Sequence, residues 1–127
     1  MHSKIAKIQE LTLLFVEDED DLVEIISDTL HKLEAKFLTA KNGQEALNVL
    51  KDNKIDVVIT DINMPIMNGL EMIGKMKELY PSLPIIIMSA HTEIEFMEKA
   101  KELGVKDYLV KPFDFIKFIE LVSSMDL

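Results

Sequence analysis

Charged side chains follow three of the five short apolar runs in this sequence. Glu17 and Asp18 come after the first run, Asp61 comes after the third, and Lys111 comes after the fifth. Open α/β sheets bind their ligands beside the carboxyl ends of their strands. Carboxylates gathered at such an edge repel one another unless a cation compensates their charge. We therefore expect one site that handles a divalent cation and a phosphoryl group.

Phosphoryl transfer would use each of these residue types in a different way. An aspartate can act as a nucleophile and accept a phosphoryl group as an acyl phosphate. Mg²⁺ binds carboxylates, water and phosphate oxygens, and it neutralises charge on a transferring group. A lysine ammonium pairs with phosphate as a compact positive charge. Ser89, which ends the fourth run, would add a hydroxyl donor at the same edge.

The five apolar runs are predicted strands, and helical patterns fill the gaps between them. The runs cover residues 11–16, 35–40, 55–60, 84–89 and 105–110. The first, third and fourth runs are nearly unbroken, which is typical of parallel strands that are covered on both faces. Apolar residues at helical spacing follow every run. The predicted order is therefore βαβαβαβαβα.

This order predicts an α/β fold, a flavodoxin-like (βα)5 doubly wound sheet. Right-handed crossovers between five parallel strands favour the strand order 2-1-3-4-5. The ligand crevice of that order lies beside strands 1 and 3, which are the strands that the acidic residues follow. We expect a short N-terminal extension at residues 1–10 and a single domain at residues 11–124.

The composition narrows the possible functions. The chain has 127 residues and no cysteine, which excludes disulfides and thiolate chemistry. The net charge of −9 argues against direct nucleic-acid binding and against binding to an anionic membrane. No apolar run approaches the roughly 20 residues of a membrane-spanning helix. We expect a soluble cytoplasmic protein.

Four segments join the charged and hydroxyl residues to distinctive neighbours. They are Val16-Glu17-Asp18-Glu19, Asp61-Ile62-Asn63-Met64-Pro65-Ile66-Met67-Asn68-Gly69, Met88-Ser89-Ala90 and Tyr108-Leu109-Val110-Lys111-Pro112-Phe113. Their order and spacing together are far more specific than any one segment. From about Leu11 to Val122 the chain resembles the response-regulator receiver domain of two-component signalling.

The resemblance implies a role for each acidic residue. Asp61 would be the phosphoacceptor and also a metal ligand. Asp18 would bind Mg²⁺ directly, and Glu17 would bind it through water. The backbone carbonyl of Asn63 would supply a further metal ligand.

The resemblance also implies a conformational switch. Lys111 would contact the phosphoryl group, Ser89 would move to bond a phosphoryl oxygen, and Tyr108 would turn inward as Ser89 moves. The peptide bond between Lys111 and Pro112 is a candidate for the cis form, which is accessible because the second residue is proline.

Partners follow from the same resemblance. A sensor histidine kinase or a phosphotransfer protein would donate the phosphoryl group. An output domain or a downstream protein would read the face formed by the fourth predicted helix, the fifth strand and the fifth helix. Such a domain is not an enzyme, except that it catalyses its own phosphorylation and dephosphorylation.

Two other functions compete with this interpretation. A haloacid-dehalogenase-type phosphohydrolase also uses a strand-end aspartate, Mg²⁺ and a lysine, but that family needs a second aspartate where this chain has Asn63. A receiver-like module could act by protein contact alone, although the complete set of acids, hydroxyl and lysine argues against it. Each of these residues by itself could also be a structural feature of a loop or a helix start.

Overall fold

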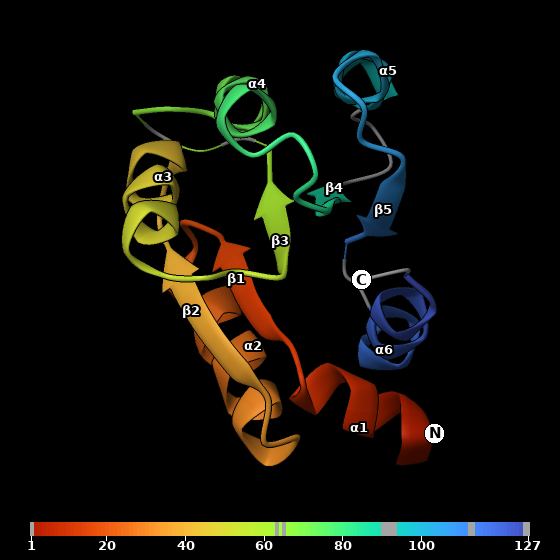
Figure 1. Ribbon diagram of the computed structural model, residues 1–127. Coiled ribbons are helices and arrows are strands. Elements are labelled where there is room, and N and C mark those ends of the chain that lie inside the picture. Colours follow the sequence, from red (N-terminus) through yellow and green to blue (C-terminus); the bar gives the residue numbers. More distant parts are fainter. Residues whose placement is uncertain (1, 63, 65, 90–93, 112–113, 126–127) are drawn as a thin grey trace.

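The computed structural model describes residues 2–62, 64, 66–89, 94–111 and 114–125. Its strands are β1 (Thr12–Val16), β2 (Lys36–Ala40), β3 (Val57–Asp61), β4 (Ile85–Ser89) and β5 (Asp107–Val110). They form one parallel sheet in the order β2-β1-β3-β4-β5 (Figure 1). The predicted fold class and strand order are confirmed.

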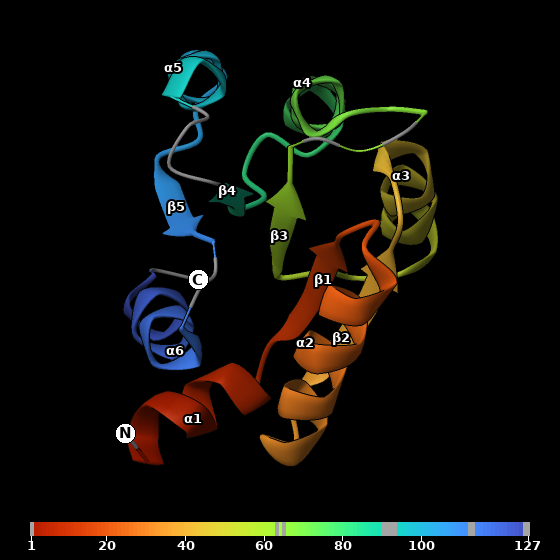
Figure 2. The same cartoon turned by 180° about the vertical axis from the view of Figure 1, so that it is seen from behind.

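Helices cover both faces of this sheet. They are α1 (His2–Gln9), α2 (Asp20–Lys32), α3 (Gly43–Asp52), α4 (Gly69–Leu79), α5 (Ile94–Glu102) and α6 (Phe115–Ser124). Helices α3, α4 and α5 pack over one face, while α1, α2 and α6 pack over the other (Figures 1 and 2). The described helices are all too short or too polar to cross a membrane.

The core is divided into two layers by the sheet itself. Successive side chains of a strand point to opposite faces, so Leu14 packs with α3 and α4 while Phe15 packs with α2 and α6. All five residues of β3 are buried. This is the pattern expected of a central parallel strand, because helices exclude water from both of its faces.

Polar caps begin three of the helices at the carboxyl edge of the sheet. The Asn42 side chain accepts a hydrogen bond from the backbone of Glu45 in α3, and Asn68 accepts one from Glu71 in α4. Asp114 caps α6 in the same way. Such caps satisfy backbone N–H groups that a helix start leaves without partners. These helix starts therefore lie on the same side of the sheet as the strand ends that carry the acidic residues.

The residues before β1 form a helix that the sequence analysis did not assign. Helix α1 packs against α6, and its Ile8 is completely buried among residues of the α2–α6 layer. An isolated helix of this length is marginal in water. Packing against the domain therefore supplies the stability of α1.

Candidate functional site

The predicted acidic residues meet at the carboxyl edge of the two central strands. Strands β1 and β3 are neighbours, and Val16 pairs with Thr60 in their register. The residues that follow each strand end are therefore brought side by side. One carboxylate oxygen from each of Glu17, Asp18 and Asp61 lies within 4.8 Å of the other two.

Lys111 joins two of these carboxylates. Its Nζ lies 2.8 Å from Oε1 of Glu17 and 2.8 Å from Oδ2 of Asp61. The Glu17 side chain is completely buried, and only 11% of the Asp61 side chain and 22% of the Lys111 side chain are exposed. The ion pairs are thus shielded from water, which strengthens them relative to pairs at the surface.

Backbone N–H groups hold the remaining oxygens. Oε2 of Glu17 accepts hydrogen bonds from the backbone of Asp18 at 3.0 Å and of Glu19 at 3.1 Å. Oδ1 of Asp61 accepts one from the backbone of Ile62 at 2.7 Å. Both carboxylates are therefore fixed in orientation before any ligand binds.

Burial and hydrogen bonding act in opposite directions on the pKa values of Glu17 and Lys111. Burial raises the pKa of Glu17, and the negative charge of Asp61 adds to this effect. Hydrogen bonds from Lys111 and from the backbone of Glu19 lower the pKa only in part. Burial lowers the pKa of Lys111, but hydrogen bonds to Asp61 and Glu17 outweigh it and raise the pKa above its ordinary value. The pKa of Glu17 and the pKa of Lys111 therefore both lie above their ordinary values.

The donor set of this site suits Mg²⁺. Three carboxylates face a single ammonium group, so the ionised cluster carries excess negative charge. Hard oxygen ligands are the ones that Mg²⁺ prefers. The half-buried Asp18 carboxylate bonds to no group in the part of the chain that the structure describes, which leaves its oxygens available. The acidic cluster therefore fits the predicted metal.

Two glycines let the loop after β3 pack closely on the helix starts. The backbone N–H of Gly69 donates to the carbonyl of Ile62 at 2.7 Å, and a Cβ at Gly69 would lie 2.5 Å from the carbonyl oxygen of Asp61. The N–H of Gly43 donates to Met67 at 3.0 Å, and a Cβ there would lie 2.8 Å from Cγ of Met67. Any side chain at Gly69 would thus displace the backbone of Asp61.

No sequence pattern assigned a positioning role to either glycine. A signal was present, because each follows an asparagine that caps the same helix: Asn42 precedes Gly43, and Asn68 precedes Gly69. What the pattern could not show is which backbone lies against the missing Cβ.

The other predicted site residues are placed as follows. Ser89 ends β4, opposite Val110 of β5, so its backbone lies at the same edge of the sheet as the acidic cluster. The hydroxyl of Tyr108 donates to the carbonyl of Met97 in α5 at 3.1 Å, so it is bonded to the α5 helix and not to the cluster. Asn63 lies outside the described residues.

The predicted cis peptide between Lys111 and Pro112 lies partly outside the described residues. The structure describes Lys111 but not Pro112. That prediction therefore stays a prediction.

Comparisons with known proteins agree on one family. A sequence model described as response regulator receiver domain matches residues 13–123. The response regulator protein FleR of Pseudomonas aeruginosa is 37% identical over 111 residues, which are 87% of this chain and 24% of FleR. The DNA-binding transcriptional regulator NtrC of Escherichia coli is 36% identical over 108 residues, which are 85% of this chain and 23% of NtrC. This chain thus spans about a quarter of the length of these curated relatives.

A solved structure gives the same result for the fold. A response regulator receiver protein from Pseudomonas putida superimposes with a TM-score of 0.83 at 31% identity. The match covers 91% of this chain and 97% of that one.

Ile66, in the loop after β3, provides a test of the loop geometry. Its φ is 68°, in the left-handed region that β-branched residues rarely adopt, and the residue is 84% exposed. Glycine adopts this region without strain, so Ile66→Gly should be more stable than Ile66→Ala by about 1 kcal/mol. Urea denaturation of both variants measures the difference. An alanine variant more stable than the glycine variant would contradict the assigned backbone conformation.

The raised pKa of Glu17 predicts how stability depends on pH. The folded state holds this proton more tightly than the unfolded state, so the contribution of Glu17 favours folding at low pH. That contribution is lost as the pH rises from about 4.5 through the raised pKa. In metal-free buffer, the free energy of unfolding of the wild type relative to Glu17→Gln should therefore fall across this range. The fall should be about 1.4 kcal/mol for each unit by which the pKa is raised.

The control for this measurement is Glu24→Gln, which removes an exposed carboxylate from α2. It accounts for the loss of one negative charge from the chain. A difference between wild type and Glu17→Gln that stays constant or rises with pH would mean that burial does not disfavour the ionised Glu17.

Proposed function

The chain belongs to the response regulator receiver domain family, and on that basis we propose that Asp61 is its phosphoacceptor. A receiver domain is a phosphorylation-based signalling switch. Membership of this family therefore argues against the alternative function of a phosphohydrolase. The observation that carries the proposal is the position of the Asp61 carboxylate. It lies at the carboxyl end of the central strand, 2.8 Å from Lys111 and within 4.8 Å of the oxygens of Glu17 and Asp18.

The acidic residues would hold Mg²⁺. Asp18 and Asp61 would bind it directly, Glu17 would bind it through water, and the backbone carbonyl of Asn63 would complete the protein ligands. When bound, the ion supplies positive charge against the oxygens of the transferring group. The excess negative charge of the cluster supports this assignment.

The transfer step uses Asp61 as nucleophile. A sensor histidine kinase or a phosphotransfer protein presents a phosphohistidine. An oxygen of Asp61 forms a bond to phosphorus while the bond from phosphorus to the imidazole nitrogen breaks, and that nitrogen keeps the electron pair. Lys111, already 2.8 Å from Asp61, places its positive charge beside the transferring group. Hydrolysis of the acyl phosphate then resets the domain.

The switch would follow from the added charge. A phosphoryl group brings roughly −1.5 to −2 charges and new acceptor oxygens. Ser89 and Lys111 would bond these oxygens, and Tyr108 would turn inward. In the structure the Tyr108 hydroxyl is bonded to Met97, so this turn would break a contact with α5. The face formed by α5, β5 and α6 would then change its shape for an output domain or a downstream protein.

Phosphorylation by a small donor tests the phosphoacceptor. With Mg²⁺ and acetyl phosphate, the wild type should gain one phosphoryl group by intact-mass measurement, while Asp61→Asn should gain none. The matched control is Asp52→Asn, an exposed position at the end of α3, which should be labelled like the wild type. Equal labelling of Asp61→Asn and wild type would place the phosphoacceptor elsewhere.

Thermal unfolding tests the metal assignment. An ion that binds only the folded state stabilises it, by about 2.7 kcal/mol when its concentration is 100 times its Kd. Mg²⁺ should therefore raise the melting temperature of the wild type by several degrees, and Asp18→Ala should lose most of that rise. Asp21→Ala, which removes an exposed acid from α2, should keep it. The metal assignment is wrong if millimolar Mg²⁺ leaves the wild-type melting temperature unchanged.

A further inference from the structure

Helix α1 lies outside residues 13–123, the part of the chain that the family model matches, yet it is packed into the domain. Ile8 of α1 is completely buried in the layer that contains Phe118 and Val122 of α6. Figures 1 and 2, which view the molecule from opposite sides, both place α1 beside α6. The helix is therefore a part of the packed structure that belongs to this chain and not to the matched family pattern.

Lys7 of α1 bonds directly to the end of α6. Its Nζ donates to the carbonyl of Ser123 at 2.8 Å and to the carbonyl of Met125 at 2.9 Å. The last carbonyls of a helix have no partners within the helix and carry the negative end of its dipole. A lysine ammonium satisfies both requirements, and hydrogen bonds from a charged donor are stronger than neutral ones. Lys7 thus clamps the carboxyl end of α6.

Gln9 makes a similar contact with α2. Its side-chain Nε2 donates to the carbonyl of Leu33, the C-cap residue of α2, at 2.8 Å. Helices α2 and α6 cover the same face of the sheet. One short helix therefore ties together the carboxyl ends of both.

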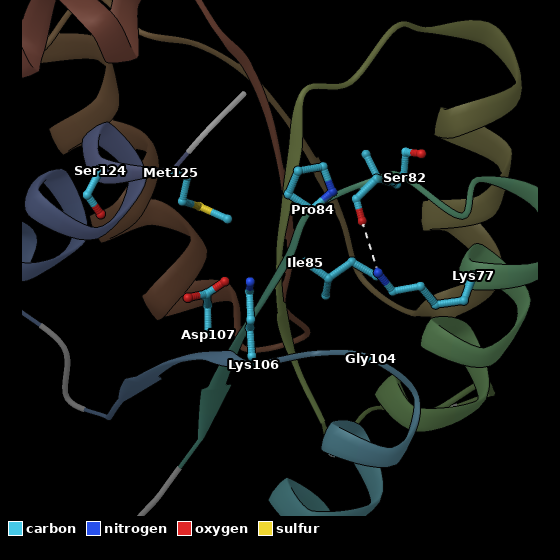
Figure 3. A pocket seen from close by; sticks show the side chains of 10 residues that line it. Lys77, Ser82, Pro84, Ile85, Gly104, Lys106, Asp107, Ser124 and Met125 are labelled. Carbon is cyan, nitrogen blue, oxygen red and sulfur yellow. Dashed lines mark hydrogen bonds between the residues drawn. The ribbon is translucent and has the colours of Figure 1, made fainter.

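A cavity borders the carboxyl end of α6. A pocket of about 400 Å³ lies at the amino edge of the sheet, and its walls include Ser124 and Met125 of the α6 end (Figure 3). Lys106 and Asp107, at the start of β5, form another part of its lining. Ser124 and Met125 thus border open space, while Lys7 of α1 bonds to the carbonyls of Ser123 and Met125.

The other end of α6 reaches the phosphoryl site. Phe115, the first residue of the helix, lines the same groove as Lys111. Phe118 packs against Phe15 of β1, with 5.7 Å between ring centroids. Helix α6 therefore runs from the neighbourhood of the candidate site to the Lys7 clamp. If the helix moves as a rigid body, movement of one end requires movement of the other.

We propose that α1 is a built-in brake: through Lys7 it holds α6 in the observed arrangement, in which Lys111 and the backbone of Ile62 bond to the two oxygens of the Asp61 carboxylate. The inference rests on the proposed function, which assigns Asp61 as the phosphoacceptor and α6 to the face that shifts on phosphorylation. A contact made in one state and weakened in the other biases the equilibrium toward the first state. By thermodynamic reciprocity, loosening the clamp must strengthen binding of a phosphoryl group to the same extent that phosphorylation loosens the clamp.

The clamp itself is tested by hydrogen exchange in the full chain without any phosphoryl mimic. Lys7→Met keeps the length of the side chain and removes its charged donor. Amides at residues 121–125 should then exchange roughly tenfold faster than in the wild type. Lys7→Arg, which retains a donor, should restore slow exchange, and Lys4→Met, an exposed position on the same helix, should change nothing. Unchanged exchange in Lys7→Met overturns the clamp.

A second variant separates the clamp from a general loss of stability. Gln9→Ala removes the bond to α2 but leaves both bonds from Lys7 to α6. It should leave exchange at residues 121–125 as slow as in the wild type. Equally fast exchange in both variants would mean that α1 stabilises the domain as a whole and does not hold α6 specifically.

The brake is tested by the affinity for beryllofluoride in the presence of Mg²⁺. Lys7→Met should bind this phosphoryl mimic about fivefold more tightly than the wild type and Lys4→Met. Equal or weaker binding overturns the brake. If the wild type and Asp61→Asn respond alike to beryllofluoride, the proposed phosphoacceptor fails and the brake fails with it. Failure of the brake alone leaves the Asp61 response intact, so the two failures are distinguishable.

Discussion

The burial of Glu17 is the constraint on which the site depends. A buried carboxylate is unfavourable unless it is paired and hydrogen-bonded. The fold meets this requirement with Lys111 on one oxygen and two backbone N–H groups on the other. The same lysine reaches Asp61, so the compensation of one buried charge also orients the second. The pairing is nevertheless incomplete, because burial still raises the pKa of Glu17 and the acids outnumber the lysine. The ionised cluster thus keeps a net negative charge that a further cation would compensate.

The parallel sheet has a carboxyl edge, where its strands end, and an amino edge, where they begin, and the two edges carry different groups. The carboxyl edge collects the acidic residues, Lys111 and the capped starts of α3, α4 and α6. The amino edge collects helix ends, where backbone carbonyls need donors. There Lys7 and Gln9 of α1 supply donors for the ends of α6 and α2. Each edge therefore has a lysine that bonds to oxygens: carboxylate oxygens at the candidate site, and backbone carbonyl oxygens at the end of α6.

Much of the fold could be predicted because it depends on local patterns. The unbroken apolar run at residues 57–60 indicated a strand covered on both faces, and β3 is buried throughout. The spacing of such runs indicated crossovers, and crossovers of fixed hand leave few possible strand orders. Helix α1 was missed because its pattern is short. Ile5 and Ile8 are the only isoleucines of this eight-residue segment, and two apolar residues one turn apart do not indicate a stable helix without the surface on which it packs.

The sequence by itself determined which residues meet at the site, since strand ends at one edge of a parallel sheet must lie together. Glu17, Asp18, Asp61 and Lys111 were all named on that ground, and they do meet. Only the tertiary structure decided how they bond. The residues of the Lys111–Glu17 pair are 94 positions apart, and Lys7 is 116 positions from its partner Ser123. Hydrogen bonds depend on distances of a few tenths of an ångström, and these are set by the packing of whole layers and not by any local pattern.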